Sequence, residues 1–214
     1  MGVFNPTVAI RTQWILANKV ILKDNFHNPP RNIAGVDVAY IGEYGLGAAV
    51  LLDYEGLHTI DEKAALIKVD IPYIPTFLAF RELPPIIKAL KRLRTKPDII
   101  MVDAHGRMHP RRCGAASHLG VVLNIPTIGV AKSRLIGKET NNGVIIDKGE
   151  VIGIKLDRNV YVSIGHRISL ETAVKIVSKT KIYKIPEPVR RAHNYAERVK
   201  KLIREGTIKI EDLL

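Results

Sequence analysis

The sequence predicts an α/β fold built on one mixed β-sheet, with three antiparallel strands first, parallel strands after them and helices on its faces. Two observations support this prediction. Three apolar, β-branched runs follow one another early in the chain and are separated by turn-forming residues, as in an antiparallel meander. Further along, an apolar strand, a helix and a second apolar strand follow with short connections, an order that favours parallel pairing.

The first half of the chain contains the expected meander and two helices. Asn5 followed by Pro6 is typical of a helix N-terminus, and we expect this helix to run to about Asp24. Its apolar side would consist of Val8, Trp14, Ile15, Ile21 and Leu22. The antiparallel strands are expected at 33–41, 46–54 and 57–69. Apolar residues at helical spacing then predict a helix over 78–95, with Pro84 and Pro85 near its beginning.

The second half contains the expected parallel strands and a series of hairpins. Strands are expected at 98–102 and 127–131, with a helix over 114–124 between them. Hairpin strands are expected at 144–147, 151–156 and 160–164. Ser169 would cap a helix to about Ser178, and Pro188 would open a last helix through Arg204. Because no linker divides the chain, we expect one domain over 1–214, with an N-terminal helix at about 6–24 and a core at about 30–205.

The composition narrows the class of protein. The 214 residues are 46% hydrophobic and 25% charged, as in ordinary globular chains, and the net charge of +12 points to a polyanionic partner. No apolar run approaches the roughly 18 to 20 residues of a membrane span, and the first residues lack the pattern of a signal peptide. Cys113 is the only cysteine, so we expect a reducing, cytoplasmic location. We also expect a monomer that does not contact membranes.

The excess positive charge is concentrated in part of the chain. Residues 1–85 hold seven basic and nine acidic residues, whereas 86–96, 104–138 and 175–204 together contribute +19. A solvated face would explain any one of these segments. Because two of them flank acidic residues that lie in apolar strands, we expect a positive field around a carboxylate site.

Three carboxylates are candidates for that site. Asp37 lies in the middle of an apolar strand, where an ionised side chain needs a partner or a cation. Asp103 directly follows a parallel strand, at the edge where ligands bind in open α/β sheets, although an Asp there is often a simple cap. Glu82 lies near the start of a helix, where it could instead stabilise the helix dipole. Together the three would form an oxygen site suited to Mg²⁺ or Mn²⁺, and the surrounding basic residues favour metal-dependent phosphodiester hydrolysis.

A zinc site is a second interpretation. His105, His109, Cys113 and His118 supply four nitrogen or sulfur ligands within fourteen residues. Glycine and proline residues between them argue against the continuous helix that would align them, and structural zinc sites usually show tighter ligand pairs. We therefore favour the carboxylate site.

Several motifs, in their order along the chain, resemble those of the endonuclease V family. They are GVDVAY at 35–40, PYIP at 72–75 with FRE at 80–82, VDAHG at 102–106 with HPR at 109–111, and ASH at 116–118 leading to PTIGVAK at 126–132. The resemblance covers roughly residues 30–195 and is specific only when the motifs are taken jointly. It implies a ribonuclease H-like fold and a Mg²⁺-dependent DNA repair endonuclease. Such an enzyme would cut the second phosphodiester bond 3′ to deoxyinosine, leaving 3′-hydroxyl and 5′-phosphate ends.

The resemblance also implies roles for the candidate residues. Asp37 and Asp103 would be metal ligands, and Glu82 would be a further ligand of the metal or of water. Lys132 would stabilise charge on the scissile phosphate, and His193 would be a fourth member of the site, although either could be a surface residue. We expect a metal ion held by Asp37 and Asp103 to activate water for in-line attack. The sequence is compatible with either one or two bound ions.

The substrate-binding residues implied by the resemblance lie in the loops. Tyr73, between Pro72 and Pro75, is similar to the wedge that enters the duplex where a base is turned out, although it could be a packing residue. Its ring could replace lost stacking, which is worth about 1 to 3 kcal/mol per base. The base pocket would be lined by residues 76–78, including Leu78, and by His109, Gly114 and Ala115, mainly through backbone groups.

The sequence departs from the family pattern at three places. The family often has Gly where this chain has Thr76, Gly in place of Ala104, and Gly-Leu where this chain has Arg112 and Cys113. These changes concern the tightness of base discrimination and not the metal chemistry.

Two alternatives stay open at this point. Another ribonuclease H-like nuclease, acting on RNA/DNA hybrids or four-way junctions, could use the same carboxylates but has no reason to carry PYIP at 72–75. A binding module without catalysis would not need Asp37 inside a strand and would bind equally well in EDTA. The choice between inosine-containing DNA and inosine-containing RNA is also open.

Overall fold

The computed structural model describes residues 4–158 and 160–214, and over these residues it contains nine strands and five α-helices. The strands are β1 (Asn32–Ile41), β2 (Tyr44–Asp53), β3 (Thr59–Lys68), β4 (Ile99–Val102), β5 (Thr127–Ala131), β6 (Lys138–Glu139), β7 (Val144–Asp147), β8 (Glu150–Asp157) and β9 (Val160–His166). The helices are α1 (Pro6–Ala17), α2 (Leu78–Arg92), α3 (Ala115–Leu123), α4 (Leu170–Thr180) and α5 (Glu187–Arg204), followed by a 3₁₀ turn at Ile210–Asp212.

All nine strands belong to one mixed sheet with the order β3-β2-β1-β4-β5-β9-β8-β7-β6. Strands β1, β2 and β3 form an antiparallel meander, and β4 and β5 continue the sheet parallel to β1. Strand β9 then pairs antiparallel with β5, and β8, β7 and β6 follow as hairpins. The predicted meander, parallel strands and hairpins are therefore confirmed, and the two-residue strand β6 is an addition.

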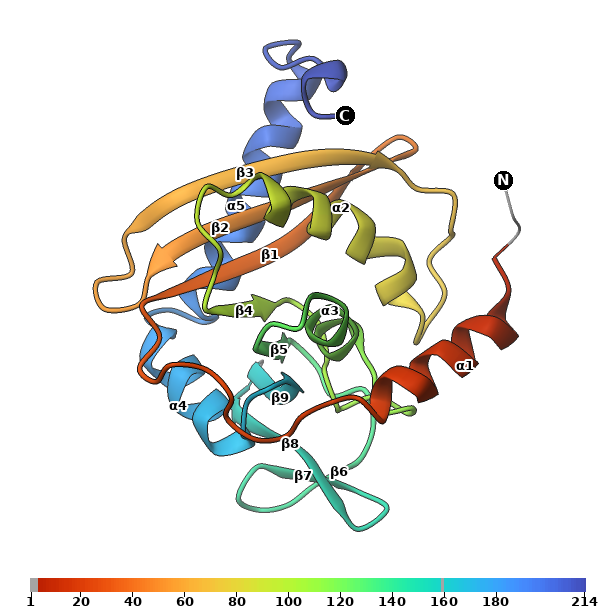
Figure 1. Ribbon diagram of the computed structural model, residues 1–214, viewed down its shortest axis with the longest axis vertical. Coiled ribbons are helices and arrows are strands. Elements are labelled where there is room, and N and C mark those ends of the chain that lie inside the picture. Colours follow the sequence, from red (N-terminus) through yellow and green to blue (C-terminus); the bar gives the residue numbers. More distant parts are fainter. Residues whose placement is uncertain (1–3, 159) are drawn as a thin grey trace.

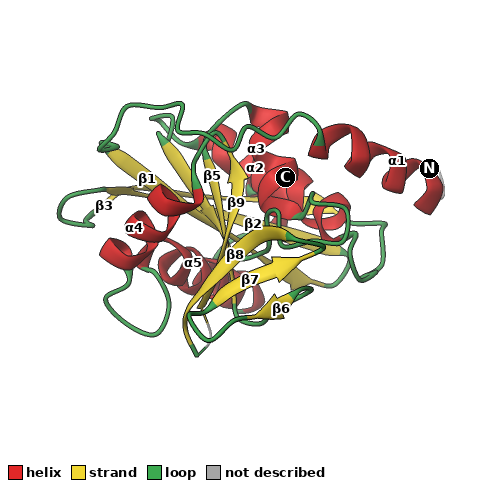
Figure 2. Cartoon of the chain, turned by 90° about the horizontal axis from the view of Figure 1, so that it is seen from below, coloured by secondary structure: helices red, strands yellow, loops and turns green. Residues whose placement is uncertain are grey.

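Helices cover both faces of the sheet, with α2 and α3 on one face and α4 and α5 on the other (Figure 1). Figure 2 shows the sheet lying between these two pairs. Successive strand residues face opposite sides, so Ile33 and Ile99 pack in the core under α4 and α5, whereas Ala34 and Ile100 pack under α2 and α3. By this alternation Asp37 points to the same face as Ile33, the face that α5 covers.

Helix α1 is shorter than expected, because it ends at Ala17 and not at Asp24. The chain after it is used in tertiary contacts. The Ile21 carbonyl oxygen accepts from the Arg167 amide at 2.7 Å, and the Asp24 carboxylate accepts from the Ser169 amide at 2.7 Å. Ile21 and Asp24 thus support the end of β9 and the start of α4, which a continued helix could not do.

The predicted apolar side of α1 is also wrong. Val8, Trp14, Ile15, Ile21 and Leu22 are all at least 40% exposed. The helix buries Ala9, Gln13 and Ala17 instead, a four-residue spacing that places the three side chains on one face. Because two of these side chains are small, α1 can lie close against its neighbours, and the amide of Gln13 must find partners there.

Helix α2 carries its two prolines in its interior, a correction to the expected position near the beginning. Pro84 and Pro85 are the seventh and eighth residues of a helix that ends at Arg92. Each lacks an amide hydrogen, which leaves two carbonyl groups of the preceding turn without helical partners. At this point the helix runs close to β2, since a Cβ added to Gly47 would lie 2.2 Å from the Pro85 backbone.

The remaining elements agree with the expected ones to within a few residues. The Ser169 hydroxyl accepts from the Thr172 amide and caps α4, as predicted. Helix α3 ends at Leu123 and is capped by Asn124, whose φ of 52° lies in the left-handed region that Asn tolerates. Within the described part of the chain, no helix has both the length and the apolar character needed to cross a membrane.

Candidate active site

Strand register brings Asp37 and Asp103 to the same level of the sheet. Parallel strands β1 and β4 pair Val36 with Val102, so the next residue on each chain is an aspartate. Asp103 lies directly beyond the carboxyl end of β4, at the edge where open α/β sheets bind ligands. The two carboxylates are close enough for the charge of Asp103 to raise the pKa of Asp37.

Lys132 joins this edge from the neighbouring strand. Strand β5 pairs Gly129 with Val102 and ends at Ala131, so Lys132 lies two residues beyond the level of Asp103 and its long side chain contacts that carboxylate. The Lys132 Nζ donates to Asp103 Oδ2 at 2.8 Å. Burial disfavours the charged lysine, but the hydrogen bond and charge of Asp103 outweigh it and raise the pKa of Lys132.

His193 reaches the same edge from α5, as expected. Its Nδ1 lies 2.8 Å from Asp37 Oδ2, and its side chain is half exposed. Burial raises the pKa of Asp37, and the bond from His193 opposes this shift without cancelling it. Asp37 therefore combines a poorly solvated carboxylate with a single histidine partner.

Glu82 approaches from α2 on the other face. The hydroxyl group of Tyr40 donates to Glu82 Oε1 at 3.3 Å, and the Arg81 guanidinium lies 4.2 Å from the centroid of the Tyr40 ring. Burial, followed by the charge of Asp37, raises the pKa of Glu82 to about 7. Three carboxylates from three elements thus share one poorly solvated region.

The carboxylates are held by protein partners in this structure. Over residues 4–158 and 160–214, no three His, Cys, Asp or Glu side chains are arranged to hold a metal ion. Asp37 is bonded to His193 and Asp103 to Lys132, so Oδ2 of each aspartate already has a cationic or neutral donor. The three carboxylates expected as metal ligands thus lie at one edge of the sheet, but their oxygens are not arranged around a common point.

The four candidate zinc ligands do not form a site within the described chain either. Burial lowers the pKa values of His105, His109 and His118 to about 4 and raises the pKa of Cys113 to about 12. These side chains are therefore neutral. His118 packs edge-on against Phe80, with ring centroids 5.2 Å apart.

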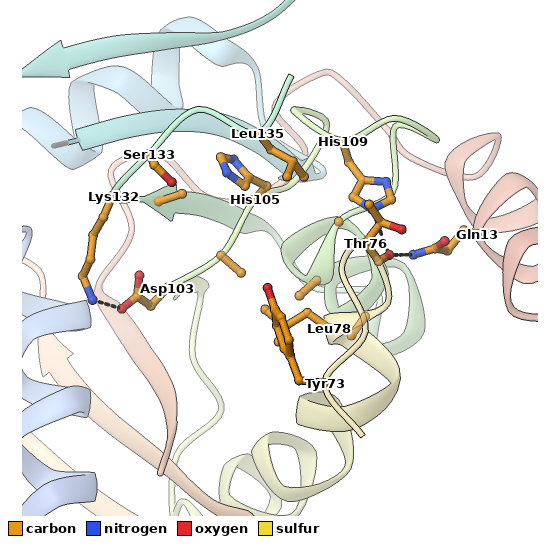
Figure 3. Close-up of a pocket in the computed structure, with 15 residues that line it drawn as sticks. Gln13, Tyr73, Thr76, Leu78, Asp103, His105, His109, Lys132, Ser133 and Leu135 are labelled. Carbon is orange, nitrogen blue, oxygen red and sulfur yellow. Dashed lines mark hydrogen bonds and ion pairs between the residues drawn. The ribbon is translucent and has the colours of Figure 1, made fainter. Parts of the chain in front are cut away.

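A cavity of about 270 Å³, called here the edge cavity, opens beside the carboxylates. Tyr73, Leu78, Asp103, His109, Gly114, Ala115 and Lys132 are among the residues that line it. Figure 3 shows Asp103 and Lys132 at one side, His109 and Thr76 at the other, and Tyr73 and Leu78 between them. The proposed substrate residues other than Pro72 thus share one cavity with Asp103 and Lys132, whereas Asp37, Glu82 and His193 do not line it.

Tyr73 is the most exposed of the large apolar and aromatic side chains in the described chain, at 68%. It belongs to the segment between β3 and α2, and Pro72 beside it is also exposed. A packing role for Tyr73 is therefore wrong. The ring is free to contact a partner that approaches the cavity.

Two residues that hold the Thr76 wall of the cavity were not predicted from the sequence as members of the site. Gln13 of α1 is 1% exposed, and its Nε2 donates to the Thr76 carbonyl oxygen at 2.8 Å. The Arg111 Nη2 donates to Thr76 Oγ1 at 2.6 Å. The only sequence signal for Gln13 is its place between Ala9 and Ala17, at the spacing of one helix face.

Two departures from the family pattern fall on residues with left-handed backbone. Thr76 has a φ of 71° and Arg112 a φ of 55°, values that favour glycine. Each side chain has partners that offset the strain. Thr76 is bonded to Arg111, and Arg112 Nε donates to Glu150 Oε2 at 2.7 Å while its Nη2 donates to Asp147 Oδ2 at 2.8 Å. Ala104, the third departure, does not have a positive φ.

The expected positive field is weaker in segment 104–138 than its composition indicates. Arg107 and Arg112 both pair with Glu150, and their side chains are only 15% and 12% exposed. Arg111 bonds to Gln13 and lies over the Phe77 ring at 4.8 Å. Half of the six basic residues in this segment therefore hold loops together and do not face solvent as free phosphate contacts.

A mixed sheet that gathers carboxylates, a lysine and a histidine beside a cavity of this kind defines a nuclease of the α/β class. The chain matches the family model described as Endonuclease V over residues 15–194. It is 44% identical over 204 residues to endonuclease V of Thermofilum pendens, with 90% of this chain and 88% of the relative covered. The chain belongs to the endonuclease V family.

Solved structures agree with this assignment. Endonuclease V from Streptomyces avermitilis matches with a TM-score of 0.87 and 35% identity, covering 96% of each chain. Endonuclease V from Ciona intestinalis, in complex with a 23-mer DNA containing an inosine followed by a ribo-adenosine, matches with a TM-score of 0.84 and 31% identity. That match covers 94% of this chain and 100% of the Ciona chain. The fold implied by the sequence motifs is thereby confirmed.

Proposed function

We propose that this protein is a Mg²⁺-dependent DNA repair endonuclease that recognises deoxyinosine. It hydrolyses the second phosphodiester bond 3′ to the lesion and leaves 3′-hydroxyl and 5′-phosphate ends. The observation that carries this proposal is that the edge cavity and the carboxylate edge share Asp103 and Lys132. A base held in the cavity would bring its own backbone to the carboxylates. The inosine-containing DNA bound by the Ciona relative supports the choice of lesion.

The loops around the edge cavity supply base recognition in this proposal. Leu78, His109, Gly114 and Ala115 line the cavity, where backbone groups and a neutral histidine would contact the hypoxanthine base. Tyr73 would fill the gap that the extruded base leaves in the stack, as its exposed ring allows. Selectivity would come from these groups, because phosphate contacts position a duplex without reading it.

The donor set at the sheet edge fits a hard divalent cation. Burial and mutual repulsion raise the pKa values of Asp37 and Glu82. The negative charge of the cluster is therefore not fully balanced by its histidine and lysine partners. Asp37, Asp103 and Glu82 would hold Mg²⁺, and Mn²⁺ has the same preference for oxygen ligands. When bound, the ion would supply an activated water and neutralise charge on the phosphate.

The other two side chains would act on the substrate and on the ligands. Lys132 lines the edge cavity and its Nζ contacts Asp103. From this position it would stabilise negative charge developing on the scissile phosphate. His193 would orient the Asp37 carboxylate through its 2.8 Å contact. Both roles use atoms that already lie at the edge.

One cleavage assay tests the proposal. Labelled duplexes containing a single deoxyinosine, a uracil or no lesion are incubated with the protein, with and without Mg²⁺. A nick one nucleotide beyond the inosine, only with metal, is expected. Asp37→Ala and Asp103→Ala should abolish cutting while binding stays measurable, whereas Asp157→Asn, on an exposed ion pair with Lys181, should cut normally. A fully active Asp37→Ala variant would exclude the carboxylate assignment.

The same assay separates the alternatives. Equal cutting of the unmodified duplex would favour a nuclease for hybrids or junctions, and binding without cutting in both Mg²⁺ and EDTA would favour a binding module. A parallel cleavage assay with inosine-containing RNA decides whether the protein prefers DNA or RNA. Binding to undamaged DNA should weaken steeply with salt, since the net charge is +12. The monomeric state and the reducing compartment indicated by the lone Cys113 stay predictions.

A further inference from the structure

Gln13 is a buried polar side chain that joins two walls of the edge cavity. From α1, its Nε2 donates to the Thr76 carbonyl oxygen at 2.8 Å and to the Cys113 carbonyl oxygen at 3.3 Å. Its Oε1 accepts from Arg111 Nε at 2.6 Å. One amide group therefore bonds to the segment before α2 and, twice, to the loop before α3.

The orientation of this amide is fixed by its partners. A guanidinium can only donate, and backbone carbonyl groups can only accept, so exchanging Oε1 and Nε2 would break all three bonds. Gln13 is 1% exposed, so losing a partner would leave a buried polar group unsatisfied. The side chain thus sets the distance between the two walls.

The wall that Gln13 holds is strained. Thr76 is a β-branched residue with a φ of 71°, a conformation that persists only where the surroundings impose it. Besides Gln13, the Thr76 carbonyl oxygen contacts His109 Nε2 at 3.0 Å and Arg111 Nη2 at 3.3 Å. Three donors from two other segments therefore hold one carbonyl group.

The tautomer of His109 is fixed by the same network. The Arg111 amide donates to His109 Nδ1 at 3.2 Å, which leaves Nε2 to carry the hydrogen that reaches Thr76. Burial lowers the pKa of His109 to about 4, so this neutral form holds at physiological pH. Every donor on Thr76 is thus in place before a substrate arrives.

We propose that Gln13 is the positioning residue of the base-binding cavity, holding the strained Thr76 backbone against the loop that carries His109 and thereby setting discrimination for the inosine base. This inference rests on the proposed function and deepens it. Gln13 acts through the backbone groups of two walls and takes no part in hydrolysis. Its loss should therefore weaken recognition of the lesion far more than it slows cutting of bound substrate.

Steady-state cleavage of inosine-containing duplex tests this, with undamaged duplex as a competitive inhibitor. Gln13→Met keeps the volume and removes all three bonds, and Gln13→Glu keeps only the acceptor facing Arg111. Both should raise KM for the inosine duplex at least tenfold, with kcat changed less than threefold and Ki of the undamaged duplex unchanged. Ile15→Ala, on the exposed side of the same helix, is the matched control and should behave as wild type.

A second substitution shows whether the effect passes through Thr76. Glycine adopts a φ of 71° without strain, so in a Thr76→Gly background Gln13→Met should raise KM less than threefold. An equal, tenfold effect in both backgrounds, accompanied by a lower Tm, would show that Gln13 only anchors α1 and would overturn the inference. Wild-type KM in Gln13→Met would do the same while leaving the proposed function intact. Equal cutting of inosine and undamaged duplexes by the wild type would overturn both.

Discussion

Pro188 of α5 lies so close to Gly35 of β1 that a Cβ added to Gly35 would sit 1.8 Å from the Pro188 carbonyl oxygen. Asp37 lies two residues after Gly35 on the same face of the strand, an advance of about 6.6 Å. His193 lies five residues after Pro188, an advance of about 7.5 Å along the helix. The strand and the helix therefore advance by nearly the same length, and the close approach at Gly35 brings His193 next to Asp37.

Gly35→Ala should lower both stability and activity. The methyl group has no room, so α5 must move away from β1 and take His193 with it. We expect the free energy of unfolding to fall by about 1 to 3 kcal/mol, as for other overpacked cores, and cleavage of inosine duplex to fall at least tenfold. Urea unfolding and single-turnover cutting measure the two effects.

Gly206→Ala is the control for this substitution. Gly206 has a φ of 73° and open space around its Cα, so alanine there costs only backbone strain of about 1 to 2 kcal/mol. Cutting should stay at the wild-type rate. If Gly35→Ala also cuts at that rate, the contact between α5 and β1 does not position His193.

Glu150→Gln should loosen the loop that follows β4. Glu150 accepts from Arg112 Nε at 2.7 Å and from Arg107 Nε at 3.1 Å, and both arginines are largely buried. Losing the charge leaves Arg107 without a carboxylate partner and Arg112 with Asp147 alone, at a cost of about 1 to 3 kcal/mol in unfolding free energy. Glu171→Gln, in an exposed pair with Lys175, should cost less than about 0.5 kcal/mol in the same urea titration. Equal costs would mean that the Glu150 contacts are surface pairs.

His118→Phe should make the protein less sensitive to acid. Burial lowers the pKa of His118 to about 4, against a model-peptide value of 6.5, and its Nδ1 has no partner within the described residues. Between these values the unfolded chain binds more protons than the folded one, so stability present above pH 6.5 is lost as pH falls towards 4. Phenylalanine keeps the edge-on packing against Phe80 and cannot titrate.

The measurement is the unfolding free energy at pH 7, 5.5 and 4 for wild type and variant. The loss between pH 7 and 4 should be smaller in His118→Phe by up to about 3 kcal/mol. Glu82, whose pKa is raised, contributes with the opposite sign, so only the difference between the two proteins is compared. The exposed His27→Gln should leave the loss unchanged. Parallel curves for His118→Phe and wild type would contradict the prediction.

The strands and most helices follow from local sequence patterns, because alternation and helical spacing depend on which residues are apolar. The same patterns placed Asp103 beyond β4 and Lys132 beyond β5, and pairing of parallel strands then brought them together. The alignment of Asp37 with Asp103 depends in addition on the register between β1 and β4. Register depends on contacts distant in sequence, so the strand patterns placed both aspartates near one sheet edge without fixing which residues pair.

The errors arose where tertiary contacts overrode local preference. Apolar side chains of α1 were assigned to its buried side, but two alanines and Gln13 lie there because the helix binds to backbone groups of the cavity walls. Arg107 and Arg112 were counted as part of a free positive field, but Glu150 lies outside their segment and neutralises them. Neither partner is near in sequence, so no local pattern indicates the pairing.

Tyr73→Ala should weaken recognition of the lesion without affecting the fold. The ring is 68% exposed and lines the edge cavity beside Leu78, so its removal should change the unfolding free energy by less than about 0.5 kcal/mol. If the ring replaces a lost stack, the alanine variant loses about 1 to 3 kcal/mol of binding, which is roughly fivefold to 150-fold in KM. Tyr73→Phe keeps the aromatic face and should retain a KM near that of wild type. A phenylalanine variant as weak as the alanine variant would assign the effect to the hydroxyl group, and wild-type KM in both would remove Tyr73 from the substrate site.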